Sequence, residues 1–161
     1  YNEKEKRTMV KNVFKKLGKK QKNNKGFSLV ELIVVIAIMA VLVGVLAPQL
    51  MKYVEKSREA TDIQNCDSIA SSLKAYYSDK EDQTDDVEIV IAGTGITTGA
   101  SDAAIVDSGL TGAKLKGKNW TSITITYTPS EGSVSYEIGG GDDAYYKVDE
   151  NDDGKFIKNE D

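Results

Sequence analysis

A glutamate stands inside the most apolar stretch of this 161-residue sequence. Between Phe27 and Met51 the strongly polar side chains are Ser28, Glu31 and Gln49. A charged side chain in hydrocarbon costs on the order of 2.5 kcal/mol or more near the bilayer centre, and less near an end. Two opposite charges that are buried together attract strongly, whereas either one alone is heavily penalised. Glu31 therefore predicts a positively charged partner within reach of its carboxylate.

A second group of oxygen-bearing side chains lies near the carboxyl terminus. Residues 149–160 fit the spacing D-x-[DN]-x-[DN]-G-x5-E, which is the pattern of an EF-hand calcium loop. The calcium ligands of such a loop would be the side chains of Asp149, Asn151, Asp153 and Glu160 and the backbone carbonyl of Lys155. Because the residues before Asp149 look like a strand, the alternative is an Asp/Asn/Gly hairpin turn between two strands. Calcium is the one cofactor that the sequence raises, and we expect no other.

Catalysis is not expected from the side chains that are present. The sequence has no histidine, so the commonest general base is absent. No serine has the Gly-x-Ser-x-Gly setting of a nucleophile. The single cysteine, Cys66, has no partner for an intrachain disulfide, and its place on an apolar stripe predicts a small core residue. We therefore expect the protein not to be an enzyme.

The apolar run around Glu31 predicts a membrane-spanning helix. About 20 apolar residues cross a hydrocarbon layer of ~30 Å as a helix, and the run from Phe27 to Met51 exceeds that length. Gly44 and Pro48 interrupt the run. Because proline removes a backbone donor and clashes with the preceding turn, we expect residues 44–48 to bend or unwind.

Charge divides sharply at the start of this run. Residues 1–26 carry ten Lys or Arg and two acids, a net charge of +8, which leaves 11 basic and 23 acidic residues and a net charge of −12 for the rest. Because basic flanks stay in the cytoplasm, the amino terminus is predicted inside and the chain after Met51 outside. The acidic exterior part argues against nucleic acid as a partner.

The string Lys-Gly-Phe-Ser-Leu-Val-Glu, residues 25–31, together with the apolar run behind it, resembles the class III signal of type IV prepilins and of their pseudopilin relatives. The resemblance implies that a membrane peptidase cleaves after Gly26 and that the new amino-terminal residue, Phe27, is methylated. It also implies that Glu31 engages the amino-terminal nitrogen of a neighbouring subunit during assembly. That nitrogen would be the positive partner which the buried acid requires.

The resemblance covers the chain from Lys25 to about Tyr77 and also concerns the leader. Residues 1–26 would be removed on maturation, and Met9 is the predicted start, which gives an eighteen-residue leader. A leader of that length before phenylalanine resembles the clostridial, Gram-positive branch of the family. In assembled filaments of the family, the segment before the residue that matches Pro48 is often unwound.

The helix is expected to continue outside the membrane, since residues 52–77 contain neither proline nor glycine. Apolar or small residues recur there at spacings of three and four and predict one buried stripe: Ile63, Cys66, Ala70, Leu73 and Tyr77. The other faces carry charged residues, which we expect in solvent: Lys52, Glu55, Lys56, Arg58, Glu59, Asp62 and Lys74. This part of the helix would therefore lay one stripe against a sheet.

Alternating and turn-forming residues after Ser78 predict that sheet. Strands are expected at residues 87–91, 120–127, 133–138, 144–148 and 155–157. A brief helix is expected at residues 101–106, with Ser101 as its cap and Gly109 as its stop. The predicted fold class is α+β, and the pilin resemblance implies a long amino-terminal helix packed on a carboxyl-terminal antiparallel sheet.

The expected organisation has three parts. They are a basic leader (1–26), a transmembrane or filament-core helix (27–51) and an extracellular head (52–161). The head would contain an amphipathic helix (52–77), an αβ-loop region (78–118), and an antiparallel sheet with a carboxyl-terminal loop (119–161).

The sequence and its resemblance predict a type IV pilin, a structural subunit that polymerises into a surface filament after cleavage. Its partners would be other copies of itself, the prepilin peptidase, the membrane before assembly and the pilus-assembly machinery, with no nucleic acid. The precursor is expected to cross the cytoplasmic membrane once with its amino terminus inside, and the assembled protein is expected in an extracellular pilus. The resemblance implies adhesion, motility or biofilm formation, and the residues choose none of them.

Three other interpretations stay open. A major pseudopilin of a secretion or DNA-uptake system shares the junction between Gly26 and Phe27 and the acid at Glu31. A membrane-anchored calcium-binding surface module would not polymerise. A plain signal anchor would let Glu31 reach the membrane surface along its flexible stem.

Overall fold

The computed structural model describes residues 26–80 and 82–159. The chain divides into two compact units, one that ends at Leu46 and one that begins at Ala47. The predicted leader up to residue 25, its predicted start Met9 and the predicted calcium ligand Glu160 lie outside the described residues.

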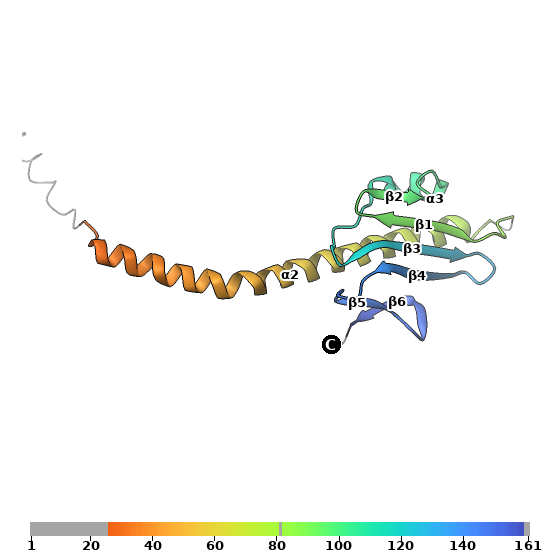
Figure 1. The fold of residues 1–161 in the computed structure, drawn as a ribbon. Helices are drawn as coiled ribbons and strands as arrows, with labels where there is room; N and C mark the ends of the chain where they lie inside the picture. Colours follow the sequence, from red (N-terminus) through yellow and green to blue (C-terminus); the bar gives the residue numbers. More distant parts are fainter. Residues whose placement is uncertain (1–25, 81, 160–161) are drawn as a thin grey trace, which may run out of the picture. The chain divides into compact units, whose positions relative to one another are not determined.

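One long helix, α2 (Leu29–Tyr77), accounts for 49 residues (Figure 1). Its start follows from local sequence, because Ser28 precedes the first helical residue and Glu31 stands three positions later. The backbone N–H of Ser28 donates to Glu31 Oε2 at 3.2 Å, which is one half of a capping box. The predicted long amino-terminal helix is confirmed.

Four antiparallel strands form the main sheet of the head, the unit that begins at Ala47. They are β1 (Val87–Ala92), β2 (Gly95–Thr98), β3 (Trp120–Thr128) and β4 (Ser133–Gly140), in the spatial order β2-β1-β3-β4. The register aligns apolar residues, with Ile125 of β3 opposite Ile89 of β1 and Tyr136 of β4. Alternation predicted β1, β3 and β4 correctly, whereas β2 was missed because its glycine- and threonine-rich surroundings look like a loop.

A separate hairpin follows the main sheet. Strands β5 (Tyr146–Asp149) and β6 (Asp152–Lys158) pair antiparallel. The rings of Phe156 and Tyr136 lie 4.7 Å apart, so β6 packs beside β4. Glycine at position 154 allows β6 to approach β4 closely, because a Cβ there would come within 2.7 Å of the Val134 carbonyl oxygen. The hairpin therefore lies against the edge that β4 would otherwise leave open.

The core lies between the sheet and the carboxyl-terminal part of α2, which runs along one sheet face in Figure 1. The helix contributes four fully or nearly fully buried apolar residues to this core: Cys66, Ile69, Ala70 and Leu73. The predicted core position of Cys66 is confirmed, and burial raises the pKa of its thiol to about 12. Ile63 and Tyr77 are half-buried at the margins of the predicted stripe.

The brief helix exists but its predicted cap is wrong. Helix α3 (Ala103–Asp107) is capped by Asp102, whose Oδ1 accepts the Ala104 N–H at 2.9 Å. Asp102 also accepts the Tyr77 hydroxyl at 2.7 Å, so a tertiary contact favours aspartate over the neighbouring serine as the cap. The predicted stop, Gly109, has a φ of 71°, a left-handed conformation that glycine adopts without strain.

Candidate functional site

The predicted cleavage junction lies outside the helix and is fully accessible. Gly26, Phe27 and Ser28 precede the first helical residue, and the Phe27 side chain is 86% exposed. A Cβ placed on Gly26 would meet nothing within 4 Å, and the residue does not have a positive φ. The fold of the described residues therefore does not require glycine at this position.

The carboxylate of Glu31 is exposed beside this junction. Its contact is the Ser28 backbone N–H described above. Among the described residues the one ion pair joins Arg58 to Glu55, so Glu31 is in no ion pair there. The predicted positive partner of Glu31 is thus not found in the part of the chain that the structure describes.

The helix behind Glu31 exposes an apolar surface over its whole circumference. By length and composition, α2 is the one helix among the described residues that is suited to cross a membrane, and none of its most apolar window is buried. Such a surface in a single chain must be covered by lipid or by protein. Gly44 and Pro48 lie inside this segment, and the backbone stays helical through both. Unwinding at residues 44–48 stays a prediction for the assembled filament.

Two acids of α2 that were expected in solvent are fully buried, which corrects the sequence prediction. Asp62 accepts the backbone N–H groups of Lys116 at 2.8 Å and of Gly117 at 2.7 Å. It also accepts the indole N–H of Trp120 at 3.1 Å. Gly117 is needed for this approach, since a Cβ there would lie 3.1 Å from Asp62 Oδ2 and 2.7 Å from the Trp120 indole nitrogen.

Glu59 and Glu55 accept hydrogen bonds from Lys118 and Asn119 of the same loop and from Tyr145. Glu59 accepts the Asn119 side-chain amide and the Tyr145 backbone N–H, each at 2.7 Å. Glu55 accepts the backbone N–H of Lys118. Burial raises the pKa of Glu59 above its ordinary value, the hydrogen bonds from Asn119 and Tyr145 oppose that rise, and the charge of Glu55 adds to it. We call Glu55, Glu59 and Asp62 the acid clasp.

The acid clasp fixes the loop that precedes β3 to the helix. Its members are three and four residues apart, so they share one face of α2. Asp62 is also four residues before Cys66, which continues the spacing of the buried stripe. Spacing alone would therefore have placed Asp62 on the buried face, although the sequence prediction assigned it to solvent. Its charge argued otherwise, because a carboxylate is rarely buried without partners. The partners are mostly backbone N–H groups, which are not visible in a sequence pattern.

The predicted calcium loop is a β-hairpin in this structure. Asp149 is in β5, whereas Asp153 and Lys155 are in β6, and the Asn151 N–H donates to Asp149 Oδ1 at 3.0 Å within the turn. An EF-hand loop curls around its ion, whereas these residues extend and pair as strands. No group of three His, Cys, Asp or Glu that could hold a metal occurs within residues 26–80 and 82–159. The alternative of a hairpin turn describes this segment correctly.

Comparison with known proteins adds to these observations. Residues 21–47 match the family described as the prokaryotic N-terminal methylation motif. The fimbrial protein EcpC of Eikenella corrodens is 27% identical over 136 residues, which are 76% of this chain and 86% of that protein. The chain is thus similar to type IV pilins and fimbrial proteins.

Two further relatives match this pilin-like chain over shorter stretches. The type IV major pilin protein PilA of Myxococcus xanthus is 29% identical over 62 residues, which are 38% of this chain and 28% of that protein. The prepilin peptidase-dependent protein A of Clostridium perfringens is 38% identical over 64 residues, which are 38% of this chain and 46% of that protein. The pilin-like chain thus spans less than half of the length of these two relatives. No solved structure matches it significantly.

Proposed function

We propose that the chain is a prepilin that is cleaved after Gly26, methylated on Phe27 and polymerised into a surface pilus. The observation that carries this proposal is an apolar helix exposed on all sides, with one acid near its start that is in no ion pair within the described residues. Lipid can cover the apolar side chains, but it offers Glu31 no positive charge within the hydrocarbon. A neighbouring copy offers both an apolar helix and an amino-terminal ammonium.

The geometry of Gly26 supports cleavage at this position. The described fold leaves room for a larger side chain there, so glycine is not explained by packing or by backbone conformation. A peptidase that needs a small residue next to the scissile bond supplies an external reason. The exposed, non-helical backbone from Gly26 to Ser28 gives such an enzyme access to an extended segment.

The head supports the extracellular part of the proposal. The residues after Gly26 carry a net charge of −12, and the basic leader carries +8, so the leader favours the cytoplasmic side. Two relatives are named as a fimbrial protein and a major pilin, which favours a pilus subunit over a pseudopilin. We assign the protein no particular role among adhesion, motility and biofilm formation, and we expect no enzymatic activity.

The test is the mass of protein sheared from the cell surface. We expect a chain that begins at Phe27 and carries one additional methyl group on its amino terminus. A second measurement uses Gly26→Val, which the described structure accommodates, so the uncut precursor should accumulate in the membrane fraction. A surface protein that starts at another residue, or cleavage that is unaffected in the Gly26→Val variant, would falsify the proposal.

A further inference from the structure

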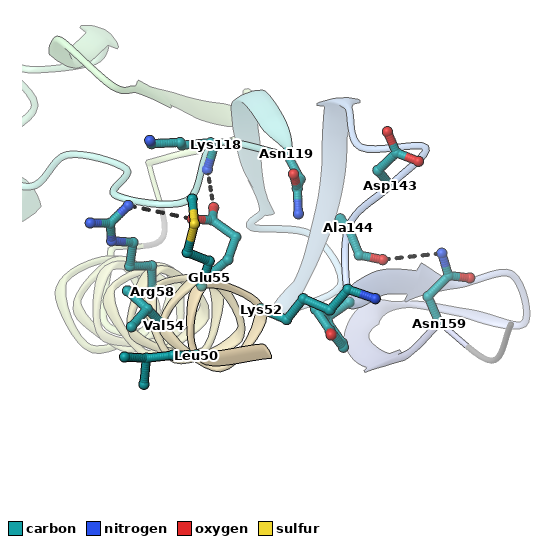
Figure 2. A pocket seen from close by; sticks show the side chains of 12 residues that line it. Leu50, Lys52, Val54, Glu55, Arg58, Lys118, Asn119, Asp143, Ala144 and Asn159 are labelled. Atoms are coloured by element: carbon teal, nitrogen blue, oxygen red, sulfur yellow. Dashed lines mark hydrogen bonds and ion pairs between the residues drawn. The ribbon is translucent and has the colours of Figure 1, made fainter. Parts of the chain in front are cut away.

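An open pocket of about 700 Å³ lies where α2 enters the head (Figure 2). Its helical wall comes from residues 50–58, and its opposite wall comes from Lys118 and Asn119 and from residues 143–145. All of these residues belong to the unit that begins at Ala47. The acid clasp holds the two walls together through Glu55 and Glu59, so the pocket has a fixed frame.

The helical wall of the pocket is apolar at the end nearest the membrane-spanning segment. Leu50 is 63% exposed, Met51 is 71% exposed and Val54 is 43% exposed. None of the three belongs to the buried core of the head. These side chains therefore gain stability if an apolar phase covers them, at roughly 25 cal/mol for each Å² removed from water.

The rim of the same pocket is basic. Lys52, Arg58 and Lys118 line it, and in Figure 2 the side chains of Arg58 and Lys118 lie on the same side of Glu55. Glu55 is already engaged, since it pairs with Arg58 at 3.4 Å and accepts the Lys118 backbone N–H. With Glu55 and Asp143 counted, the pocket lining carries a net charge of +1, whereas the residues after Gly26 together carry −12. The net charge of the pocket lining is thus opposite in sign to the net charge of the head around it.

The position of these residues in the chain places them at the membrane surface. About 20 helical residues from Leu29, where α2 begins, cross a hydrocarbon core of ~30 Å, which ends the span near Pro48. Residues 50–54 follow it by about 3 to 9 Å of helix at ~1.5 Å per residue. The headgroup layer on each side of a bilayer is roughly 5 to 8 Å thick. Lys52 therefore comes at the level of the lipid phosphates.

We propose that this pocket binds the headgroups of anionic phospholipids at the outer surface of the membrane while the subunit awaits assembly. Lys52, Arg58 and Lys118 contact the phosphates, and the side chains of Leu50 and Met51, which lie nearest the hydrocarbon core, contact the adjoining acyl chains. Basic side chains attract anionic lipid, and their aliphatic stems lie along apolar surface. The inference rests on the proposed function, because it requires a precursor that sits in the membrane with its head outside.

Lipid fits the pocket better than a second copy of the chain does. The pocket combines an apolar wall with a basic rim, and a phospholipid presents both matching groups within one molecule. A second copy would have to supply them from two separate parts, its apolar helix, where Glu31 is the one acid between Phe27 and Met51, and its acidic head. Chain connectivity also brings lipid to residues 50–54 before any filament forms.

The test measures the accessibility of individual lysines in the full-length chain after reconstitution into vesicles. A membrane-impermeant amine reagent labels the protein in phosphatidylcholine vesicles and in vesicles that also contain phosphatidylglycerol, and mass spectrometry gives the labelling of each lysine. We expect Lys52 and Lys118 to be labelled on the order of fivefold less in the anionic vesicles, which corresponds to about 1 kcal/mol per basic residue. High salt should restore their labelling, because it screens the attraction.

Lys74, an exposed lysine far along the same helix, is the internal reference and should be labelled equally in both vesicles. Lys118→Gln should reduce the protection of Lys52 in the anionic vesicles, and Lys74→Gln, the matched control, should not. Inorganic phosphate added to phosphatidylcholine vesicles should give no protection, which separates lipid from free phosphate.

Equal labelling of Lys52 and Lys118 in the two vesicles would overturn the inference. Protection that ignores lipid charge but grows with the amount of protein per vesicle would also overturn it, in favour of a second copy in the pocket. The mass of the surface protein is unaffected by either result, so a failure of the proposed function is read separately.

Discussion

Asp62 receives three N–H donors that come from one short stretch of chain, residues 116–120. The carboxylate is fully buried, and its partners are backbone and indole groups without charge. Each of these donors needs an acceptor, because an unpaired buried polar group costs about 1–3 kcal/mol. Asp62 therefore acts as the anchor of the loop that leads into β3.

Replacing Asp62 with alanine should destabilise the head strongly. Asp62→Ala leaves the N–H donors of Lys116, Gly117 and Trp120 without an acceptor, so we expect the free energy of unfolding to fall by about 3 kcal/mol or more. The measurement is denaturant unfolding followed by fluorescence of Trp120, the single tryptophan of the chain. Asp62→Asn should cost less, since its amide oxygen still accepts.

The matched control is Glu137→Ala, which removes an exposed acid of β4. A change of less than about 0.5 kcal/mol is expected there. If the Asp62 and Glu137 variants unfolded alike, the role of Asp62 as an anchor would be wrong.

Glu59 should make the stability of the head depend on pH. Because burial raises its pKa, folded Glu59 binds a proton more readily than unfolded Glu59 does. Its contribution is then fully present below the unfolded pKa of 4.5 and is lost as pH rises through the higher folded pKa. We expect Glu59→Gln to remove this part of the decline in unfolding free energy between about pH 4.5 and neutrality.

The Gln variant should be less stable than the native protein at low pH, since one of the two donors, Asn119 or Tyr145, then faces an amide nitrogen. The readout is a series of denaturant curves over this pH range. If the native protein and the Glu59→Gln variant showed the same change of stability with pH over this range, the assignment to Glu59 would be wrong.

The hairpin of β5 and β6 shows how one sequence pattern can serve two structures. Asp149, Asn151 and Asp153 have the spacing of calcium ligands, yet the strands pair Asp149 with Asp152 and Val148 with Phe156. The contact between the rings of Phe156 and Tyr136 ties this pairing to the main sheet. Packing therefore favours the extended form of the segment.

Calcium should leave the stability of the hairpin unchanged. Asp149 and Asp153 lie in the paired strands β5 and β6 and not in a loop that curls around an ion, so we expect the same melting temperature with millimolar calcium and with a chelator. The measurement is a thermal melt of the full-length chain. A melting temperature that rises with calcium in the native protein but not in Asp149→Ala would show that Asp149 binds the ion.

The molecule as a whole joins two units that are stable in different surroundings, one apolar and one aqueous. The unit up to Leu46 exposes apolar side chains that water does not favour, and the unit from Ala47 has its own buried core. A chain of this kind is stable only when the first unit is covered, by lipid in the precursor and by other subunits in a filament. We propose that Glu31 favours the second environment, because only other subunits supply a positive charge.

Filament formation should depend on that charge. We expect Glu31→Ala and Glu31→Gln to abolish surface filaments counted by electron microscopy, since neither can pair with an ammonium. The precursor should still be cut after Gly26, which the mass of the membrane-bound protein checks. Glu137→Ala, which removes an exposed acid of the head, should leave the filament count unchanged. Filaments as abundant in Glu31→Ala as in the native protein would point to a simple membrane anchor.

The sequence by itself determined the features that depend on local or periodic physics. The apolar run predicted the first part of α2, and the absence of proline and glycine from residues 52–77 predicted its continuation. Alternation predicted β1, β3 and β4, and the spacing of small residues placed Cys66 in the core. These features were predictable because neighbours along the chain alone decide hydrophobic periodicity and backbone freedom.

Only the tertiary structure decided the fate of side chains whose partners are distant in sequence. The burial of Glu59 and Asp62 depends on N–H groups more than fifty residues away, and the cap of α3 depends on Tyr77. The hairpin at Asp149 likewise follows from packing against β4 rather than from its ligand-like spacing. A carboxylate is stable in the interior when enough donors converge on it, and that convergence is a property of the folded chain, not of the residue.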